Sequence, residues 1–337
     1  MRRTLAVLVP AFLGLTLLAA PAPTAAASTT ISIRAATFNV RTARETGDRQ
    51  TWLQRAPEVA HAILARNPGV VMLQELGPGR ADGKIGGLDG HVAQTTSLTN
   101  ALSRLGGSRY KLVRTTPYIY PGEPHATEGA RILYDSSRYR LLSHCPQMTN
   151  HTHWNPSCSF DLPLAAGDSK ALRRSAAYAK FAQRKSGREF WVVSTHLDKR
   201  HSTNKATEAK FDRLRARQAA AVVSKMASLN TQHLPVIFGA DMNSWQTDSG
   251  HYAPHRQLVA DGYADAVSAK TKINWRYPTI TKFRVDMVKT KSKYGGSRLD
   301  AVMVKGAKQF TRWENMMANP DRTRPSDHNM VVADFRI

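Results

Sequence analysis

ISIRAATFNV at residues 31–40 and VVMLQEL at 70–76 are two apolar runs that enclose a helical pattern. Between them, residues 51–66 place apolar side chains at helical spacing, and Asn-Pro-Gly at 67–69 ends that pattern. Short runs rich in Val and Ile are typical of strands that are buried on at least one face. A strand, a crossover helix and a second strand predict a parallel or mixed β-sheet in an α/β domain.

Four later runs have the same build and carry polar residues beside a β-rich stretch. They are WVVSTHLD at 191–198, LPVIFGADMN at 234–243, SRLDAVMV at 297–304 and PSDHNMVVADF at 325–335. Polar residues at the ends of buried strands can be held rigidly near one another. The pattern therefore predicts that these runs, together with 70–76, form the floor of a catalytic site.

A second helical pattern covers residues 203–229 and indicates one further long helix. No internal repeat or long linker interrupts the chain, so the sequence predicts a single catalytic domain over residues 28–337. The side chains that we expect on the inner face of the second helix are Phe211, Leu214, Val222, Met226 and Leu229.

Residues 1–27 begin with two arginines after Met1, continue with an apolar stretch, and end with small residues. This order is typical of a secretory signal peptide. A membrane anchor is the alternative, but Pro10 and Gly14 interrupt the apolar stretch and leave it short for a spanning helix. We expect a secreted, extracellular protein, exported by the Sec or the twin-arginine route.

The chain is strongly basic, with 48 Lys and Arg against 25 Asp and Glu and a formal net charge of +23. Such a charge attracts polyanions and favours nucleic acid as a partner, although it also suits solubility or retention at a cell envelope. Within residues 270–298, cations alternate with aromatic side chains. This stretch is either a nucleic-acid groove, with Trp275 and Arg298 binding substrate, or a solvated loop whose aromatic residues serve the core.

Cys145 and Cys158 are the two cysteines of the chain. An even pair in an exported protein predicts one disulfide bond. Zinc binding is the alternative because His144, His151 and His153 lie nearby, but their spacing matches no common structural zinc pattern.

Three acidic residues and a histidine suggest phosphoester chemistry. Glu75, at the end of a strand, can hold a hard divalent cation, Mg2+ first and Mn2+ or Ca2+ as alternatives. Asp327 and His328 are adjacent and cannot easily bond each other, so a third residue must orient the imidazole. Asp300 is the natural candidate, because a carboxylate on one ring nitrogen leaves the other nitrogen to take a proton from water.

In this order the motifs TFNV, LQEL, STHLD, GADMN, RLDAV and SDH resemble those of the endonuclease/exonuclease/phosphatase superfamily, over about residues 31–337. The resemblance implies the DNase I-like fold, a four-layer αββα sandwich of two packed mixed sheets flanked by helices. It also implies metal-dependent hydrolysis of phosphate esters.

The resemblance assigns roles to the catalytic positions. Glu75 is the main metal ligand, assisted by Asn39 and Asp327. Asp241 and Asn243 orient the attacking water and hold the phosphate. His328 is the general base, and Asp300 is its orienting partner.

Two further positions, His196 and Arg41, distinguish branches of the superfamily, and four others have less specific matches. His196 matches a histidine that contacts the phosphate and protonates the leaving oxygen; the abasic-site repair branch has a tyrosine there. Arg41 stands where that branch has an acidic residue. Whether a second metal ion binds at this position is therefore left open. Arg131 and Tyr134 match a segment that binds phosphate, the alternative being a buried strand in which Tyr134 only packs. His125 and Glu128 have weaker claims.

We therefore expect a secreted Mg2+-dependent phosphodiesterase that hydrolyses DNA or RNA by direct attack of water, as a monomer without a stable protein partner. A phospholipid or sphingomyelin phosphodiesterase, or a phosphoinositide phosphatase, is the alternative with the same mechanism. A non-catalytic polyanion-binding protein is the alternative of a different class.

Overall fold

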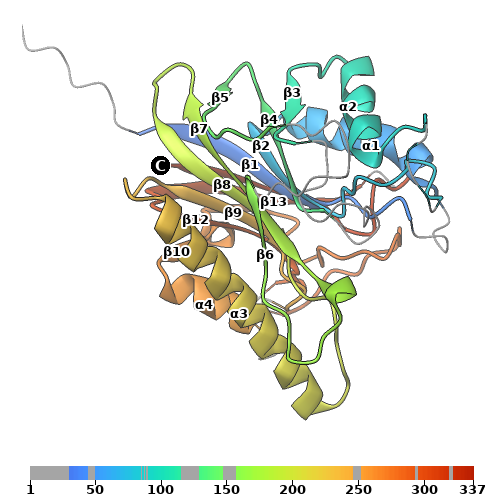
Figure 1. The fold of residues 1–337 in the computed structure, drawn as a ribbon, viewed down its shortest axis with the longest axis vertical. Helices are drawn as coiled ribbons and strands as arrows, with labels where there is room; N and C mark the ends of the chain where they lie inside the picture. Colours follow the sequence, from blue (N-terminus) through green and yellow to red (C-terminus); the bar gives the residue numbers. More distant parts are fainter. Residues whose placement is uncertain are drawn as a thin grey trace, which may run out of the picture.

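Two β-sheets pack face to face in this protein, and helices cover both outer faces (Figure 1). The structure, a computed structural model, describes residues 30–44, 50–84, 86, 88, 90–114, 129–146, 157–245, 252–292, 295–318 and 322–337. The predicted signal peptide and His125, Glu128, His151 and His153 lie outside the described residues. The expected four-layer αββα arrangement is confirmed.

The first sheet has seven strands in the order β11-β13-β14-β1-β2-β4-β3. β1 pairs with β2 in parallel and with β14 antiparallel, and α1 is the crossover connection between β1 and β2 that the sequence predicted. The strands are β1 Ser32–Asn39, β2 Val70–Gln74, β3 Tyr110–Leu112, β4 Arg131–Asp135, β11 Thr271–Ile273, β13 Gln309–Met316 and β14 Met330–Arg336.

The second sheet also has seven strands, in the order β10-β12-β9-β8-β7-β5, with β6 paired to β7. β8 and β9 are parallel, whereas β9 and β12 are antiparallel. The strands are β5 Tyr139–Leu141, β6 Ser159–Asp161, β7 Ser175–Gln183, β8 Glu189–His196, β9 Val236–Asp241, β10 Tyr263–Asp265 and β12 Asp300–Lys305.

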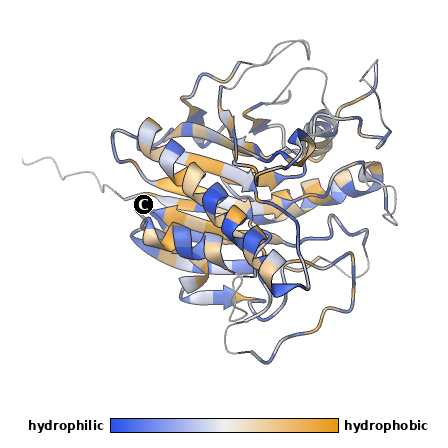
Figure 2. Cartoon of the chain, turned by 60° about the horizontal axis from the view of Figure 1, so that its bottom comes forward, coloured by the Kyte–Doolittle hydropathy of each residue, from blue (hydrophilic) through white to orange (hydrophobic). Residues whose placement is uncertain are grey.

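Helices α1 (Trp52–Arg66) and α2 (Gln94–Arg104) cover the first sheet, and α3 (Lys205–Leu229) and α4 (Ala253–Ala260) cover the second. Two 3-10 turns lie at Lys170–Leu172 and Ala266–Ser268. Figure 2 shows mainly hydrophobic strands and helices that carry both kinds of residue. No helix in the described part of the chain is long and apolar enough to span a membrane.

The predicted inner face of α3 is largely as expected. Leu214, Val222 and Met226 are buried, and Leu229 packs against the same core while half-buried. Phe211 is half-buried, and the Arg200 guanidinium lies 4.9 Å from its ring centroid.

Alternation along the strands separates three apolar layers. On β1, Ile33 and Ala35 lie between the sheets, while Phe38 packs beneath α1. On β9, Ile237 points into the layer between the sheets and Phe238 into the layer under α3. The sheets therefore share one central core, and each has a second core beneath its helices.

Gly239 lets the two sheets approach each other closely. A Cβ atom at this position would lie 2.4 Å from the end of the Met72 side chain, which comes from the facing sheet. Gly239 lies two residues before Asp241. Any larger side chain at position 239 would therefore push the two sheets apart near the end of β9.

The central layer becomes polar toward one end of the sheets. Gln74 Nε2 donates to Thr37 Oγ1 at 3.1 Å and to Ser194 Oγ at 3.3 Å, and Ser194 Oγ donates to the Leu73 carbonyl at 2.9 Å. All three polar side chains are fully buried. This layer links β1, β2 and β8 and lies between the apolar core and the polar strand ends.

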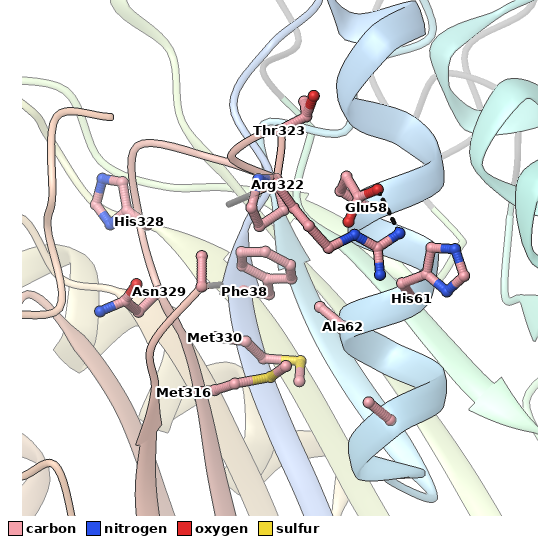
Figure 3. A pocket seen from close by; sticks show the side chains of 13 residues that line it. Phe38, Glu58, His61, Ala62, Met316, Arg322, Thr323, His328, Asn329 and Met330 are labelled. Atoms are coloured by element: carbon pink, nitrogen blue, oxygen red, sulfur yellow. Dashed lines mark hydrogen bonds and ion pairs between the residues drawn. The ribbon is translucent and has the colours of Figure 1, made fainter. Parts of the chain in front are cut away.

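A cavity of about 140 Å³ lies between α1 and the ends of β1, β13 and β14 (Figure 3). Its walls include Phe38, Met316 and Met330, and His328 lies at its edge. An ion pair of 2.8 Å joins Arg322 to Glu58 on α1 beside this cavity. The cavity is therefore mainly apolar.

The predicted disulfide bond is confirmed, because Cys145 is joined to Cys158. It connects the segment after β5 to the start of β6, and both strands pair with β7. The bond closes a loop at the edge of the second sheet.

Replacing Cys145 and Cys158 together by serine should lower the free energy of unfolding by about 3 kcal/mol, the chain-entropy value for a loop of about 15 residues. Urea denaturation of the variant and the wild-type protein measures this difference. Added reductant should destabilise the wild type only. Identical midpoints for the two proteins would contradict a stabilising bond.

Candidate active site

Three polar side chains lie in one row at the end of the second sheet. In the sheet register Asp241 on β9 is the partner of His196 on β8 and of Asp300 on β12. Residues that pair across neighbouring strands point to the same face of a sheet. The inward alternation of β9 therefore places all three side chains between the sheets, beyond the buried polar layer.

Asn39, the last residue of β1, connects this row to the first sheet. Its Nδ2 donates to Asp241 Oδ2 at 2.9 Å and to Glu75 Oε1 at 3.0 Å. All three side chains are buried. One amide group thus bridges two carboxylates that come from different sheets.

Glu75 reaches this position because the chain leaves the strand conformation there. Gln74 already points into the central layer, so a continued strand would turn Glu75 toward the helices. Instead Glu75 has a φ of 58°, in the left-handed region, and its Oε2 accepts a hydrogen bond from Thr42 N at 2.9 Å. The unusual backbone aims the carboxylate at Asn39.

Two more site residues have left-handed backbones, Arg41 with a φ of 60° and Asn243 with a φ of 45°. Arg41 N donates to Asn39 Oδ1, and Asn243 N donates to Asp241 Oδ1, both at 3.0 Å. Asn243 Nδ2 donates to the Leu197 carbonyl, also at 3.0 Å. Such conformations persist where surrounding contacts hold them, and they concentrate at functional sites.

Arg55 of α1 fixes the loop after β1. Its guanidinium is buried and donates to the Val40 carbonyl at 2.7 Å, the Pro325 carbonyl at 3.0 Å and the Thr42 carbonyl at 3.2 Å. The helix thereby holds both the segment that carries Arg41 and the segment that precedes His328. Arg55 was not predicted as a site residue, although an arginine on the apolar face of a predicted helix was a signal.

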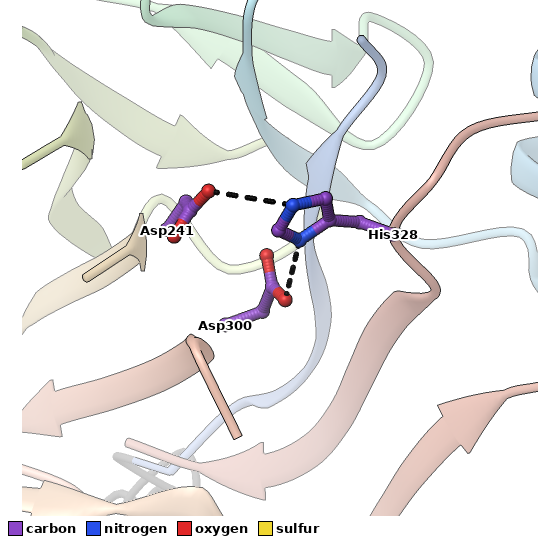
Figure 4. A group of neighbouring side chains, drawn as sticks. All are labelled: Asp241, Asp300 and His328. Atoms are coloured by element: carbon purple, nitrogen blue, oxygen red, sulfur yellow. Dashed lines mark hydrogen bonds and ion pairs between the residues drawn. The ribbon is translucent and has the colours of Figure 1, made fainter. Parts of the chain in front are cut away.

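His328 lies between two carboxylates (Figure 4). Its Nδ1 is 2.9 Å from Asp300 Oδ2, and its Nε2 is 3.7 Å from Asp241 Oδ2. The first contact is the one expected of an orienting carboxylate, while the catalytic roles stay predictions. Burial alone would lower the pKa of His328, but the charges of Asp300 and Asp241 outweigh it and raise this pKa well above its usual range.

His196 lies on the other side of Asp241. Its Nε2 is 3.4 Å from Asp241 Oδ2, and its Nδ1 is 3.3 Å from Nη1 of Arg174. A guanidinium only donates hydrogen bonds, so Nδ1 is the acceptor and Nε2 carries the proton. Burial and the positive charge of Arg174 lower the pKa of His196 to about 3, which keeps the ring neutral. Sequence analysis did not identify Arg174.

Asp327 lies next to Arg41 at the edge of the cluster, with 3.3 Å between Oδ2 and Nη1 of the arginine. The hydroxyl of Ser326 donates to the Asn39 carbonyl at 2.7 Å and also lies 3.2 Å from Asp327 Oδ1. The Asp-His segment is therefore attached directly to the end of β1.

The cluster fits a hard divalent cation. Ligand atoms of Asp241, Asp300 and His328 lie within 4.8 Å of one another, and the buried Asp300 Oδ1 has no hydrogen-bond partner among the described residues. Glu75 and Asp241 are buried carboxylates held near one amide, and such charges need positive compensation. Oxygen ligands of this kind suit Mg2+, Mn2+ or Ca2+.

The predicted substrate-binding residues are scattered. Arg131 is buried at the end of β4 that pairs with Leu73, near the site. Tyr134 lies at the opposite end of β4, with its ring centroid 5.1 Å from that of Phe181 in the central core. This packing matches the alternative considered for Tyr134.

Trp275 packs partly against the central core, and the Arg276 guanidinium lies 5.1 Å from its ring centroid. Arg298 is buried, two residues before Asp300. Within the described ranges, no hydrogen bond or ion pair joins Trp275 to Asp241 or His328. The groove over residues 270–298 thus stays a prediction.

No protein-family model and no curated protein matches the sequence. Solved structures do match. An endonuclease/exonuclease/phosphatase family protein from Bacteroides thetaiotaomicron has a TM-score of 0.63 and 19% identity over 91% of this chain and 98% of its own. The mannosyl-6-phosphatase of the same species has a TM-score of 0.63 and 18% identity over 90% and 99%.

TDP2 from D. rerio, solved with a single-strand DNA product, has a TM-score of 0.53 and 15% identity over 90% of this chain and 98% of its own. At these identities the likeness is one of fold. The fold that the resemblance implied is confirmed.

Replacing Asp300 by asparagine should lower the pKa of His328, because it removes a facing carboxylate while burial is retained. A raised pKa stabilises the folded state below the unfolded value of about 6.5, and this gain is lost as pH rises through the folded pKa. The variant should therefore lose most stability relative to wild type at pH 6 and below.

NMR titration of the histidine Cε1–H signals in EDTA, with His328→Gln to assign the resonance, measures the pKa directly. An unchanged pKa of His328 in the variant would contradict this electrostatic account.

Proposed function

We propose that this protein is a secreted, divalent-cation-dependent hydrolase of phosphodiester bonds in nucleic acid. The observation that supports it is that three groups of side chains meet. These are the oriented histidine His328, the row of His196, Asp241 and Asp300 at the end of the second sheet, and Glu75 after β2 of the first sheet. A base, its orienting carboxylate and oxygen ligands for a cation lie at one point.

His328 and Asp241 would activate the water. Asp300 Oδ2 accepts a hydrogen bond from Nδ1–H of His328, which leaves Nε2 facing Asp241. In the base form, Nε2 takes a proton from a water molecule that Asp241 Oδ2 also contacts. The water oxygen bonds to phosphorus, the bond to the leaving oxygen breaks, and that oxygen takes up a solvent proton. The enzyme forms no covalent intermediate.

His196 would hold the phosphate rather than transfer a proton. With Nδ1 facing Arg174, the neutral ring presents its Nε2 proton toward the reacting centre. A neutral imidazole is a hydrogen-bond donor and a poor acid. In this proposal His196 stabilises a phosphate oxygen, and the proton transfer to the leaving oxygen that the resemblance implies stays an alternative prediction.

Glu75 and Asn39 would hold the cation, assisted by Asp327 as the sequence predicts and by Asp241, which lies beside Asn39. Mg2+ is our first choice. When bound, it would supply positive charge that neutralises the phosphate and the nearby carboxylates. Asn39 would keep the two carboxylates oriented, as it does through its present hydrogen bonds.

The choice of nucleic acid rests on charge. A net charge of +23 favours a polyanionic substrate over a small phosphate ester. A second candidate is a sugar phosphomonoester, because the mannosyl-6-phosphatase matches with a higher TM-score than TDP2. Export is supported by the signal-like residues 1–27 and by the disulfide bond.

The decisive assay compares residues 28–337 with Glu75→Ala and His328→Ala on plasmid DNA, RNA, mannose 6-phosphate and sphingomyelin vesicles, with Mg2+ or EDTA. We expect Mg2+-dependent cleavage of nucleic acid and a loss of about 10²- to 10⁴-fold in His328→Ala. Two substitutions elsewhere in the chain are matched controls. His144→Ala, at an exposed histidine, is the control for His328→Ala, and Glu189→Ala is the control for Glu75→Ala.

Cleavage of mannose 6-phosphate or sphingomyelin alone would reassign the substrate. Binding of nucleic acid without any hydrolysis would favour the non-catalytic alternative.

Salt provides an independent check on the substrate class. A protein that makes six to ten phosphate contacts loses about 10³- to 10⁵-fold in affinity between 50 and 200 mM salt. Fluorescence anisotropy of a labelled oligonucleotide with Ca2+ in place of Mg2+ measures the slope. A slope near zero would rule out recognition through the phosphate backbone.

A further inference from the structure

Two exposed or half-exposed rings stack on each other beside the site. The His201 and Trp245 ring centroids are 5.5 Å apart, and the ring planes differ by 7°. Trp245 follows Asn243 by two residues, and His201 lies on the loop that continues from His196. Neither ring belongs to the three core clusters. The pair therefore contributes little to the core of the described structure.

Buried charges fix the orientation of His201. Its Nδ1 is 3.2 Å from Oε1 of Glu208, and the same oxygen accepts a hydrogen bond from Nη2 of Arg215 at 2.6 Å. Glu208 and Arg215 lie on α3 and are both buried. The imidazole is thus held by an ion pair beneath it, while 36% of its side chain is exposed.

The loop that carries Trp245 is attached to the same part of α3. Ser244 Oγ donates to Asp212 Oδ1 at 3.4 Å, and Asp212 is 3.7 Å from Arg215. The side chain of Asn243 bonds the Leu197 carbonyl, so the two loops also contact each other directly. The rings are therefore held in place by the elements that position the active site.

Their place relative to the site follows from the chain. Two residues span at most about 7 Å, which limits the distance from the Asn243 Cα to the Trp245 Cα. The ring pair therefore lies within a few nucleotides of the site. Lys199 is exposed on the same loop as His201 and places a positive charge there.

We infer that the His201–Trp245 pair is a stacking platform for a nucleobase of single-stranded nucleic acid, close to the phosphate that is cleaved. The inference rests on the proposed function and specifies its substrate. Stacking surfaces combined with cations are the means by which proteins bind single strands without sequence preference. In a duplex the faces of each base are already covered by neighbouring bases.

The test compares Trp245→Ala, Trp245→Phe and His201→Ala on a single-stranded oligonucleotide and on versions with one abasic unit near the cleaved bond. Trp245→Ala should raise KM by about 5- to 150-fold at unchanged kcat, the range for loss of one stacked base. Trp245→Phe should retain most of the affinity, and His201→Ala should have an intermediate effect.

The abasic series separates stacking from a general disturbance of the loop. When the abasic unit replaces the base that stacks on the platform, the KM of the wild type should rise, whereas the KM of Trp245→Ala should not change. The abasic unit and the Trp245→Ala substitution remove the same contact, so their effects should not add. Val259→Ala, at an exposed apolar residue of α4, is the control variant and should match the wild type on every oligonucleotide.

An unchanged KM in Trp245→Ala, or an abasic effect that persists in this variant, would overturn the platform and leave the proposed function intact. If the wild type cleaves other phosphate esters but no nucleic acid, the proposed function and the platform both fail.

Discussion

The hydrogen bonds of the Asn39 amide join the two sheets at the point where the layer between them carries charge. Glu75 and Asp241 would repel each other if they were buried side by side without a donor. Once Asp241 is fixed, the strand register places His196 and Asp300 on either side of it. His328 then completes the cluster by pairing with Asp300. The geometry of the site thus follows from one amide and from the pairing of three strands.

The molecule as a whole and its candidate site differ in the sign of their charge. The chain as a whole is strongly basic, whereas the candidate site gathers buried carboxylates. A polyanion would be drawn toward the protein and then meet negative charge at the reacting point. Arg41 and Arg174 offset part of that charge at the edges. A cation among the oxygen ligands would remove the remaining conflict.

Local patterns in the sequence predicted most of the architecture. The strand–helix–strand opening, the long helix α3 and the disulfide bond depend on periodicity or on residue type, and the structure confirms them. The adjacency of Asp327 and His328 was enough to require a third residue, and Asp300 lies there. Helices α2 and α4 were not predicted.

Residues that act through distant partners could not be predicted in this way. Arg55 bonds carbonyls of two loops that are far apart in the sequence, and Arg174 contacts His196 across a strand pair. The position of Tyr134 depends on which end of β4 faces the site, and strand alternation alone does not specify an end. The left-handed backbone at Glu75 is likewise set by its hydrogen bonds rather than by a turn motif. These features need the register of the assembled sheets.

The position of β14 between β1 and β13 has a consequence for the order in which the molecule forms. β1 is synthesised early, and one of its edges stays open until β14, near residue 337, has been made. His328 lies two residues before β14, so the histidine arrives with the strand that closes the first sheet. A chain still on the ribosome therefore has an unpaired sheet edge, which leaves it vulnerable to aggregation at that stage. It also lacks the contact between His328 and Asp300 until its last strand is in place.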